Sequence, residues 1–267
     1  MAELTPSSTS AAKRDPFPVN WWTRALWAVA LAYVVYAFGL LDLNWDRMVA
    51  GMGHGGDMLA RMVPPNFSRW SLLLEGMLES LEIAVLASAV GILLSLPIGF
   101  LAARNMMPPW ITWPARALIA ICRSFHPVIV AIIFVKAVGF GALAGILALI
   151  VASIGFIAKL FAEAIEEISL KQVEAVRATG ASFGNVIIFS VVPQVLARFV
   201  GFATYQIDSN LRNSTMVGIV GAGGIGGTLF SAFQRFDYDF VAAILISLIA
   251  VIMAGEYLSI WVKEVFK

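Results

Sequence analysis

The sequence predicts an all-α integral membrane protein, a polytopic bundle of about six transmembrane helices. Of its 267 residues, 60% are hydrophobic and only 13% are charged, whereas a soluble domain carries roughly a quarter charged residues. The mean hydropathy is +0.86. The apolar residues also form six runs, each close to the 20 or so residues that a helix needs to cross about 30 Å of hydrocarbon. A soluble enzyme and a disordered chain are both disfavoured.

Each predicted span is an apolar run bounded by polar or charged residues. The runs are residues 25–41, 83–103, 117–135, 137–158, 186–207 and 240–255, the last continuing to about Trp261. The third run contains Arg123 and His126, and the fifth contains Arg198. His126 stands beside Pro127, where we expect a kink in the third span. A long external loop is expected at residues 42–79, with a short helix leading into the second span.

The distribution of polar and basic residues predicts the orientation of the chain. Residues 1–20 are rich in Ser and Thr, so we expect a flexible cytoplasmic tail ahead of a membrane domain at residues 21–267. Lys and Arg gather at one set of span ends, which is typical of the cytoplasmic side. These are Lys13, Arg14, Arg24, Arg104, Arg116, Lys159, Lys171, Arg177, Lys263 and Lys267. The bias favours a multi-pass protein with cytoplasmic N- and C-termini.

The scarcity of reactive residues limits the chemistry that the chain can perform. Cys122 is the single cysteine, so no intrachain disulfide can form. His54 and His126 are the only histidines, which disfavours a metal site. No base–nucleophile pair stands out, so we expect no catalytic residue. The net charge of +1 gives no reason to expect nucleic acid as a partner.

The predicted internal loop at residues 166–185 carries a spaced motif. It contains Glu174-Ala175-Val176-Arg177-Ala178-Thr179-Gly180, and Pro193 follows thirteen residues after Gly180. This loop resembles the signature cytoplasmic loop of permeases of binding-protein-dependent ABC importers. That signature begins Glu-Ala-Ala and has Gly six residues after the Glu. Val176, Ser190 and Val192 depart from the family pattern, but the spacing is kept.

The resemblance implies that this loop is a cytoplasmic coupling helix. In the family the helix docks on an ATPase subunit, and the Gly permits a sharp turn beside it. The resemblance assigns ATPase coupling to Glu174, Ala175, Arg177, Gly180 and Ala181. The alternative is an ordinary amphipathic connector between two spans.

Two further segments resemble the phosphonate-type branch of these permeases. Residues 209–226 read SNLRNSTMVGIVGAGGIG, and residues 161–168 read FAEAIEEI. The likeness runs from about residue 75 to the end of the permease domain. Relatives often carry Pro-Glu-Leu where this chain has His126-Pro127-Val128. The resemblance implies import of phosphonate, phosphite or a related phosphorus oxyanion.

Three glycines in this region also match a dinucleotide-binding fingerprint. Gly221, Gly223 and Gly226 fit the pattern G-x-G-x-x-G. That motif requires a βαβ unit, whereas here it lies between membrane spans. We therefore expect a structural role in tight turns and close helix packing.

Charged and amide side chains within or beside the spans are candidates for a substrate pathway. Such groups are costly in lipid and usually face the bundle interior or water. The candidates are Arg123, His126, Asp208, Asn210, Arg212, Asn213 and Ser214. Arg212 either contacts substrate through its planar fork or forms a structural pair with Asp208, four residues earlier. Arg123 either lines the pore or reaches to the membrane interface.

The resemblance also implies partners in a bacterial cytoplasmic (inner) membrane. Two copies would form the pathway as a homodimer in contact with lipid, and an extracytoplasmic substrate-binding protein would deliver the anion. Two ATP-binding cassette ATPase subunits would bind ATP and Mg, since this chain has no phosphate loop and no expected cofactor of its own. Import of methionine or another small solute by the same machinery, and a non-ABC scaffold or channel, remain open alternatives.

Overall fold

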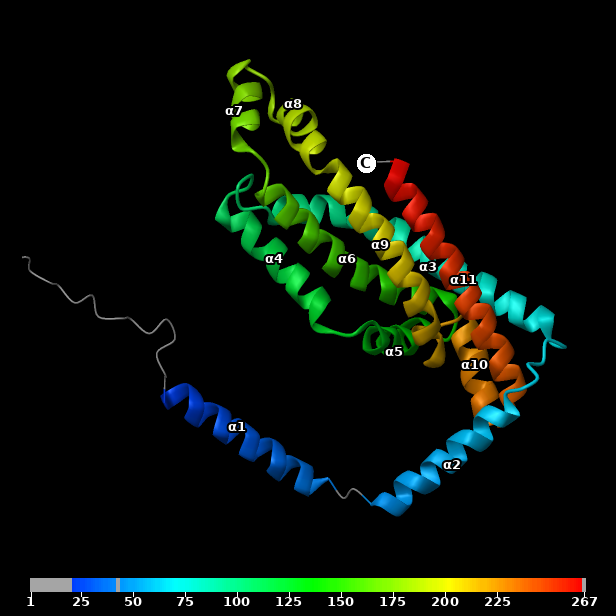
Figure 1. Cartoon of the computed structure of the whole chain (residues 1–267). Coiled ribbons are helices and arrows are strands. Elements are labelled where there is room, and N and C mark those ends of the chain that lie inside the picture. The colour runs from blue at the N-terminus through cyan, green and yellow to red at the C-terminus, as the bar shows by residue number, and fades with distance from the viewer. Residues whose placement is uncertain (1–20, 42–43, 266–267) are drawn as a thin grey trace, which may run out of the picture. The chain divides into compact units, whose positions relative to one another are not determined.

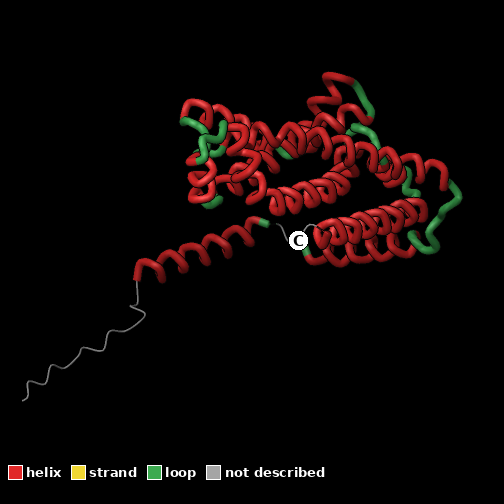
Figure 2. The backbone as a smooth tube through the Cα atoms, turned by 90° about the horizontal axis from the view of Figure 1, so that it is seen from above, coloured by secondary structure: helices red, strands yellow, loops and turns green. Residues whose placement is uncertain are grey.

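A computed structural model describes residues 21–41 and 44–265, so the predicted tail at residues 1–20 lies outside the described part (Figure 1). The described residues form helices and connecting loops without a strand (Figure 2). The chain divides into two compact units, and the boundary between them lies between Gly56 and Asp57 in the sequence. Each unit is described separately.

The first unit contains α1 (Trp21–Leu40) and most of α2 (Trp45–Arg61). α1 is long and apolar enough to cross a membrane, as the first predicted span requires. α2 lies in the segment expected to be a loop. Its first turn is capped by Asn44, whose Oδ1 accepts a hydrogen bond of 3.0 Å from the Asp46 N–H. Such a cap satisfies a backbone donor that has no partner within the helix.

The second unit is built on α3 (Trp70–Ala102), α6 (Ala142–Glu166) and α9 (Val192–Ile219). α3 packs along α6, and both helices contact α9. α10 (Ile225–Gln234) and α11 (Tyr238–Val265) pack against α9. The expected short helix before the second span is the beginning of α3, whose 33 residues extend about 50 Å and exceed the hydrocarbon thickness.

Small residues allow α3 and α6 to approach closely. A Cβ atom on Gly91 of α3 would lie 2.5 Å from Cβ of Ser153 on α6. Close packing of this kind associates helices in lipid, where burial of apolar surface gives little drive. The interface is completed by fully buried Ala87, Ala148 and Leu149.

The third predicted span is divided into two helices in the structure. α4 (Pro109–Ser124) and α5 (Pro127–Val138) are bent by 90° at their junction. Phe125 and His126 are extended, with ψ of 137° and 141°. For His126 the cause is Pro127, because the residue before a proline is disfavoured in the helical region. The predicted third span over residues 117–135 is therefore kinked at His126 and Pro127, as the sequence predicts, although the bend is as large as 90°. The described chain has five helical segments able to span a membrane, or six if this bent pair counts as one.

The segment between α6 and α9 projects from one end of the second unit. It contains α7 (Leu170–Ala178), α8 (Phe183–Val186) and the π-helical turn η1 (Ile187–Val191). The fifth predicted span is thus part of a longer helical segment, Phe183–Ile219. Figure 1 shows α7 and the end of α11 at one end of this unit and α5 and α10 at the other.

Candidate translocation site

A buried polar network joins the three central helices. Asn210 on α9 is fully buried. Its Nδ2 donates to Ser88 Oγ on α3 at 3.0 Å and to Ser153 Oγ on α6 at 2.9 Å. Gln206 Nε2 donates to Asn210 Oδ1 at 2.9 Å and to Ser153 Oγ at 3.0 Å. These bonds satisfy amide groups that lipid could not, and they fix α9 against α3 and α6.

Asp208 and Arg212 form an ion pair along α9. The distance from Arg212 Nη2 to Asp208 Oδ2 is 2.7 Å, and the side chains are 44% and 13% exposed, respectively. The second carboxylate oxygen, Asp208 Oδ1, is buried without a hydrogen-bond partner. The pair expected from the four-residue spacing is therefore formed, while contact between Arg212 and substrate stays a prediction.

Asn213 and Ser214, the two other candidates on α9, differ in their environment. Asn213 is half-buried, and its Nδ2 donates to Ser209 Oγ at 3.4 Å. Ser214 is fully buried and donates to the Leu211 carbonyl oxygen at 2.8 Å. Of the α9 candidates, the structure thus turns Asn210 and Ser214 into the bundle and leaves Arg212 exposed.

The two candidates near the helix bend lie apart from α9. Arg123, in the last turn of α4, lines a cavity of about 330 Å³ together with Lys159 and Glu163 of α6. His126 caps α5, and its Nδ1 accepts a hydrogen bond of 3.4 Å from the Val128 N–H. His126 therefore has a structural contact at the bend, and its contact with substrate stays a prediction.

A glycine-rich loop connects α9 to α10 at the end of the unit opposite α7 (Figure 1). Gly221, Gly223 and Gly224 have φ of 87°, 83° and 78°, values that favour residues without a Cβ atom. A Cβ atom on Gly226 would lie 1.9 Å from the Thr215 carbonyl oxygen. The glycines thus allow a tight turn and close packing of α10 on α9, the structural role that the sequence predicts.

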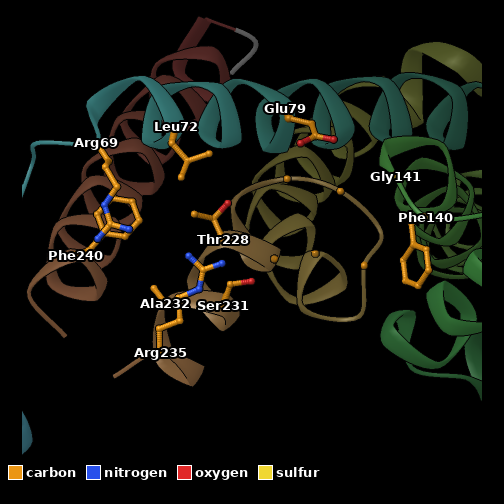
Figure 3. Close-up of a pocket in the computed structure, with 15 residues that line it drawn as sticks. Arg69, Leu72, Glu79, Phe140, Gly141, Thr228, Ser231, Ala232, Arg235 and Phe240 are labelled. Carbon is orange, nitrogen blue, oxygen red and sulfur yellow. The ribbon is translucent and has the colours of Figure 1, made fainter. Parts of the chain in front are cut away.

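This loop borders a cavity of about 420 Å³ (Figure 3). Two arginines line it together with Glu79, Thr228 and Ser231. Figure 3 shows the guanidinium of Arg235 beside Thr228 and Ser231, with Glu79 on the opposite wall. Among the described residues, Arg235 has no carboxylate within ion-pair distance. The cavity therefore offers a guanidinium and two hydroxyls as hydrogen-bond donors.

The second arginine of the cavity is held by its neighbours. Arg69 lies over the Phe240 ring, 4.0 Å from its centroid, and forms an ion pair with Asp237. Asp239, beside it, accepts a hydrogen bond of 2.9 Å from Asn66 Nδ2. These contacts tie the segment before α3 to the start of α11 and shape the wall of the cavity.

Sequence reasoning singled out the glycines of this cavity, but not its charged and hydroxyl residues. One signal was available: Arg69 and Arg235 flank predicted spans at the external end, against the basic bias of the cytoplasmic end. Basic residues at the external end are not explained by the orientation rule, so they are candidates for a functional role. Thr228 and Ser231 gave no comparable signal, because hydroxyl residues are common in membrane helices.

The predicted coupling residues lie on and beside α7. Glu174, Ala175 and Arg177 are exposed, whereas Val173 is buried and Val176 is half-buried. The buried face packs on a cluster formed by α8, η1 and the neighbouring ends of α3, α6 and α9. This cluster contains Ala103, Met106, Phe161, Ala164, Ile165, Val186, Val191 and Val195. α7 thus has an anchored face and a free face.

The turn after α7 has the geometry that the sequence motif predicts. Gly180 has φ of 76°, and nothing lies within 4 Å of the position that a Cβ atom would take. Ala181 is half-buried against the same cluster. Before α7, Arg198 pairs with Glu167 at 2.5 Å, and Gln194 Oε1 accepts a hydrogen bond of 2.9 Å from the Ser169 N–H. The segment that leads into α7 is therefore tied to α9.

Comparison with known proteins identifies the family. Residues 95–266 match the family of binding-protein-dependent transport system inner membrane components. The chain belongs to this family. It is 41% identical over 238 residues to the phosphate-import permease protein PhnE of Mycolicibacterium smegmatis, covering 88% of this chain but 45% of that relative. It is 37% identical to the phosphite transport system permease protein PtxC of Stutzerimonas stutzeri, covering 94% of this chain and 92% of the relative.

Solved structures support the fold of this inner membrane component. An inward-facing structure of the MetNI methionine ABC transporter matches with a TM-score of 0.68 and 24% identity, covering 76% of this chain and 99% of the solved chain. At this identity the likeness shows the fold alone. The predicted resemblance to ABC importer permeases and the predicted all-α membrane bundle are both confirmed.

Proposed function

We propose that this chain forms half of the translocation pathway of an ATP-driven importer for a phosphorus oxyanion: phosphonate, phosphite or phosphate. The observation that carries the substrate class is the 37% identity over almost the full length of a phosphite permease. The 41% identity to a phosphate-import permease agrees with it. The likeness to the methionine transporter is in fold, at 24% identity, and does not favour methionine as cargo.

The cavity beside the glycine-rich loop suits an entry point for such an anion. The planar guanidinium of Arg235 can bind two oxygens of a phosphorus oxyanion at once. The hydroxyls of Thr228 and Ser231, which line the same cavity, supply further donors. Glu79 on the opposite wall weakens binding by repulsion, which allows release. In this proposal the cavity faces the extracytoplasmic side and receives the anion from a substrate-binding protein.

The anchored α7 suits the transfer of motion from an ATPase. Two partner ATPase subunits, which bind ATP and Mg, would contact the exposed face with Glu174 and Arg177. When the ATPases close, α7 would move as a rigid body because its buried face and the segment before it are held. The displacement would reach α9 and α6, which carry the polar network. Two copies of the chain would form the complete pathway.

Uptake by cells tests this proposal. Cells expressing the chain with its ATPase and substrate-binding protein are given labelled phosphite, methylphosphonate, phosphate or methionine. We expect saturable uptake of at least one phosphorus oxyanion and no effect of excess methionine on it. Saturable uptake of methionine alone would keep the importer but reject the proposed substrate class.

A further inference from the structure

Four basic side chains gather along the seam between α4 and α6, near the end that carries α7. They are Arg104 in the loop after α3, Arg116 and Arg123 on α4, and Lys159 on α6. These residues line two adjoining cavities of about 550 and 330 Å³, which share Arg104, Arg116 and Ala120 in their walls. We call this region the basic seam.

The basic seam carries more positive charge than its carboxylates neutralise. Arg116 pairs with Glu166 at 2.5 Å, and Lys159 pairs with Glu163. Four cations against two carboxylates leave an excess of two positive charges. Neither Arg104 nor Arg123 has a carboxylate within ion-pair distance in the part of the chain that the structure describes. Two guanidinium groups are therefore available to a ligand.

The seam extends from the end of α6 into the bundle. Arg123 lies against Gly155 of α6, where a Cβ atom would be 2.8 Å from Arg123 Cγ. Gly155 and Glu166 are eleven residues apart on α6, which corresponds to about 16 Å along a helix axis. The four cations thus form a row rather than a single surface patch.

Exposed tryptophans place the outer end of the seam at the membrane interface. Trp110 and Trp113 on α4 are 76% and 78% exposed, and Trp113 lines the larger cavity. Indole rings favour the level of the lipid headgroups. Basic pockets between transmembrane helices at this level bind phosphate-bearing headgroups on the cytoplasmic side.

We propose that the basic seam binds a tetrahedral phosphate-type anion through Arg104 and Arg123. Guanidinium forks match the oxygens of such a group in geometry and charge. Two sources share this chemistry: the headgroup of an anionic phospholipid, and a free anion that leaves the pathway at this end. The second source rests on the proposed function, whereas the first does not.

The experiment uses the purified full-length chain in detergent, without ATPase or substrate-binding protein. One arm titrates phosphatidylglycerol, with phosphatidylcholine as the zwitterionic control, and counts bound lipid by native mass spectrometry. The other arm measures binding of labelled inorganic phosphate by equilibrium dialysis. The variants are R104Q/R123Q, the charge-conserving R104K/R123K, and R24Q as a control, since Arg24 lines neither cavity and lies over Trp21 on α1.

We expect R104Q/R123Q to weaken binding about tenfold or more, because two charge-assisted interactions are lost. R104K/R123K should lie between this variant and wild type, and R24Q should match wild type. Loss of phosphatidylglycerol binding alone identifies the headgroup, and loss of saturable phosphate binding identifies the free anion. The proposal is overturned if wild type binds neither ligand, or if R104Q/R123Q binds both as wild type does. Neither result depends on whether cells import a phosphorus oxyanion.

Discussion

At the level of single residues, the Asn210 side chain is the centre of the bundle's polar network. Its two N–H donors bond Ser88 and Ser153, and its Oδ1 accepts a hydrogen bond from Gln206. Hydrogen bonds between helices in membranes contribute on average about 0.6 kcal/mol each, with a maximum of about 1.7 kcal/mol. A residue that makes several of them should have a measurable effect on stability.

We expect Asn210→Leu to destabilise the folded chain by about 1–2 kcal/mol, since it removes the hydrogen bonds of Asn210 to Ser88, Ser153 and Gln206. Unfolding in mixed detergent, followed by circular dichroism, measures the change. Asn213→Leu is the control, because Asn213 is half-buried and makes one long bond to Ser209. Equal stabilities of the two variants would contradict a structural role for Asn210.

The Asp208–Arg212 pair gives a second prediction at this level. Arg212→Ala leaves the largely buried Asp208 carboxylate unpaired. We expect this to lower the free energy of unfolding by about 1–3 kcal/mol, which lies between the values for exposed and buried ion pairs. Asp208→Asn combined with Arg212→Ala removes the charge and should restore most of the stability and the uptake. If the double variant is stable but its uptake stays low, Arg212 contacts the transported anion.

The sequence predicted which side chains are costly in lipid, but not their partners. Asn210 and Arg212 were both selected, yet one is buried in a network and the other is exposed. This difference depends on the rotation of α9 relative to its neighbours, which a single sequence does not encode directly. Ser88 and Ser153 were missed because a serine in an apolar run has no distinguishing pattern.

At the level of elements, α7 and its following turn form the predicted coupling segment. Gly180 adopts a positive φ in open space. Substitution there strains the backbone without a steric clash, at a cost of about 1–2 kcal/mol. Substitution of Gly180 should therefore change the orientation of α7 more than the fold of the bundle.

We expect Gly180→Val to assemble normally but to uncouple ATP hydrolysis from transport. The measurement is the ratio of substrate transported to ATP hydrolysed in the purified complex, which should fall several-fold. Gly184→Val is the control, because Gly184 is also exposed and in open space but has no positive φ. An unchanged ratio in Gly180→Val would show that this turn does not position the coupling helix.

The bend between α4 and α5 shows what hydropathy could not predict. The third apolar run has the length of a single span, yet Pro127 begins a new helix after two extended residues. Hydropathy measures how well a segment tolerates lipid, not the direction of its backbone. The proline was visible in the sequence, but the 90° angle depends on packing against α6.

At the level of the whole molecule, the basic residues at span ends predict the orientation in the membrane. The family assignment agrees with an inner membrane protein. Cytoplasmic N- and C-termini remain a prediction from the Lys and Arg distribution. That orientation places α7 inside the cell and α2 outside it.

Labelling of single cysteines tests this orientation. In a Cys122→Ser background, we expect a membrane-impermeant maleimide to label Gly53→Cys in α2 from outside. It should label Gln172→Cys in α7 only after the cells are permeabilised. Both positions are exposed, so accessibility within the protein does not limit the reaction. The reverse pattern would invert the proposed topology.

The most direct test of the central claim is transport of labelled phosphite into proteoliposomes. The vesicles contain this chain with its ATPase and enclose ATP, and the substrate-binding protein is added outside. We predict accumulation that requires both ATP and the substrate-binding protein and that excess methionine does not reduce. Phosphite entry at the same rate without ATP would indicate a channel, and ATP-driven uptake of methionine but of no phosphorus oxyanion would contradict the proposed substrate.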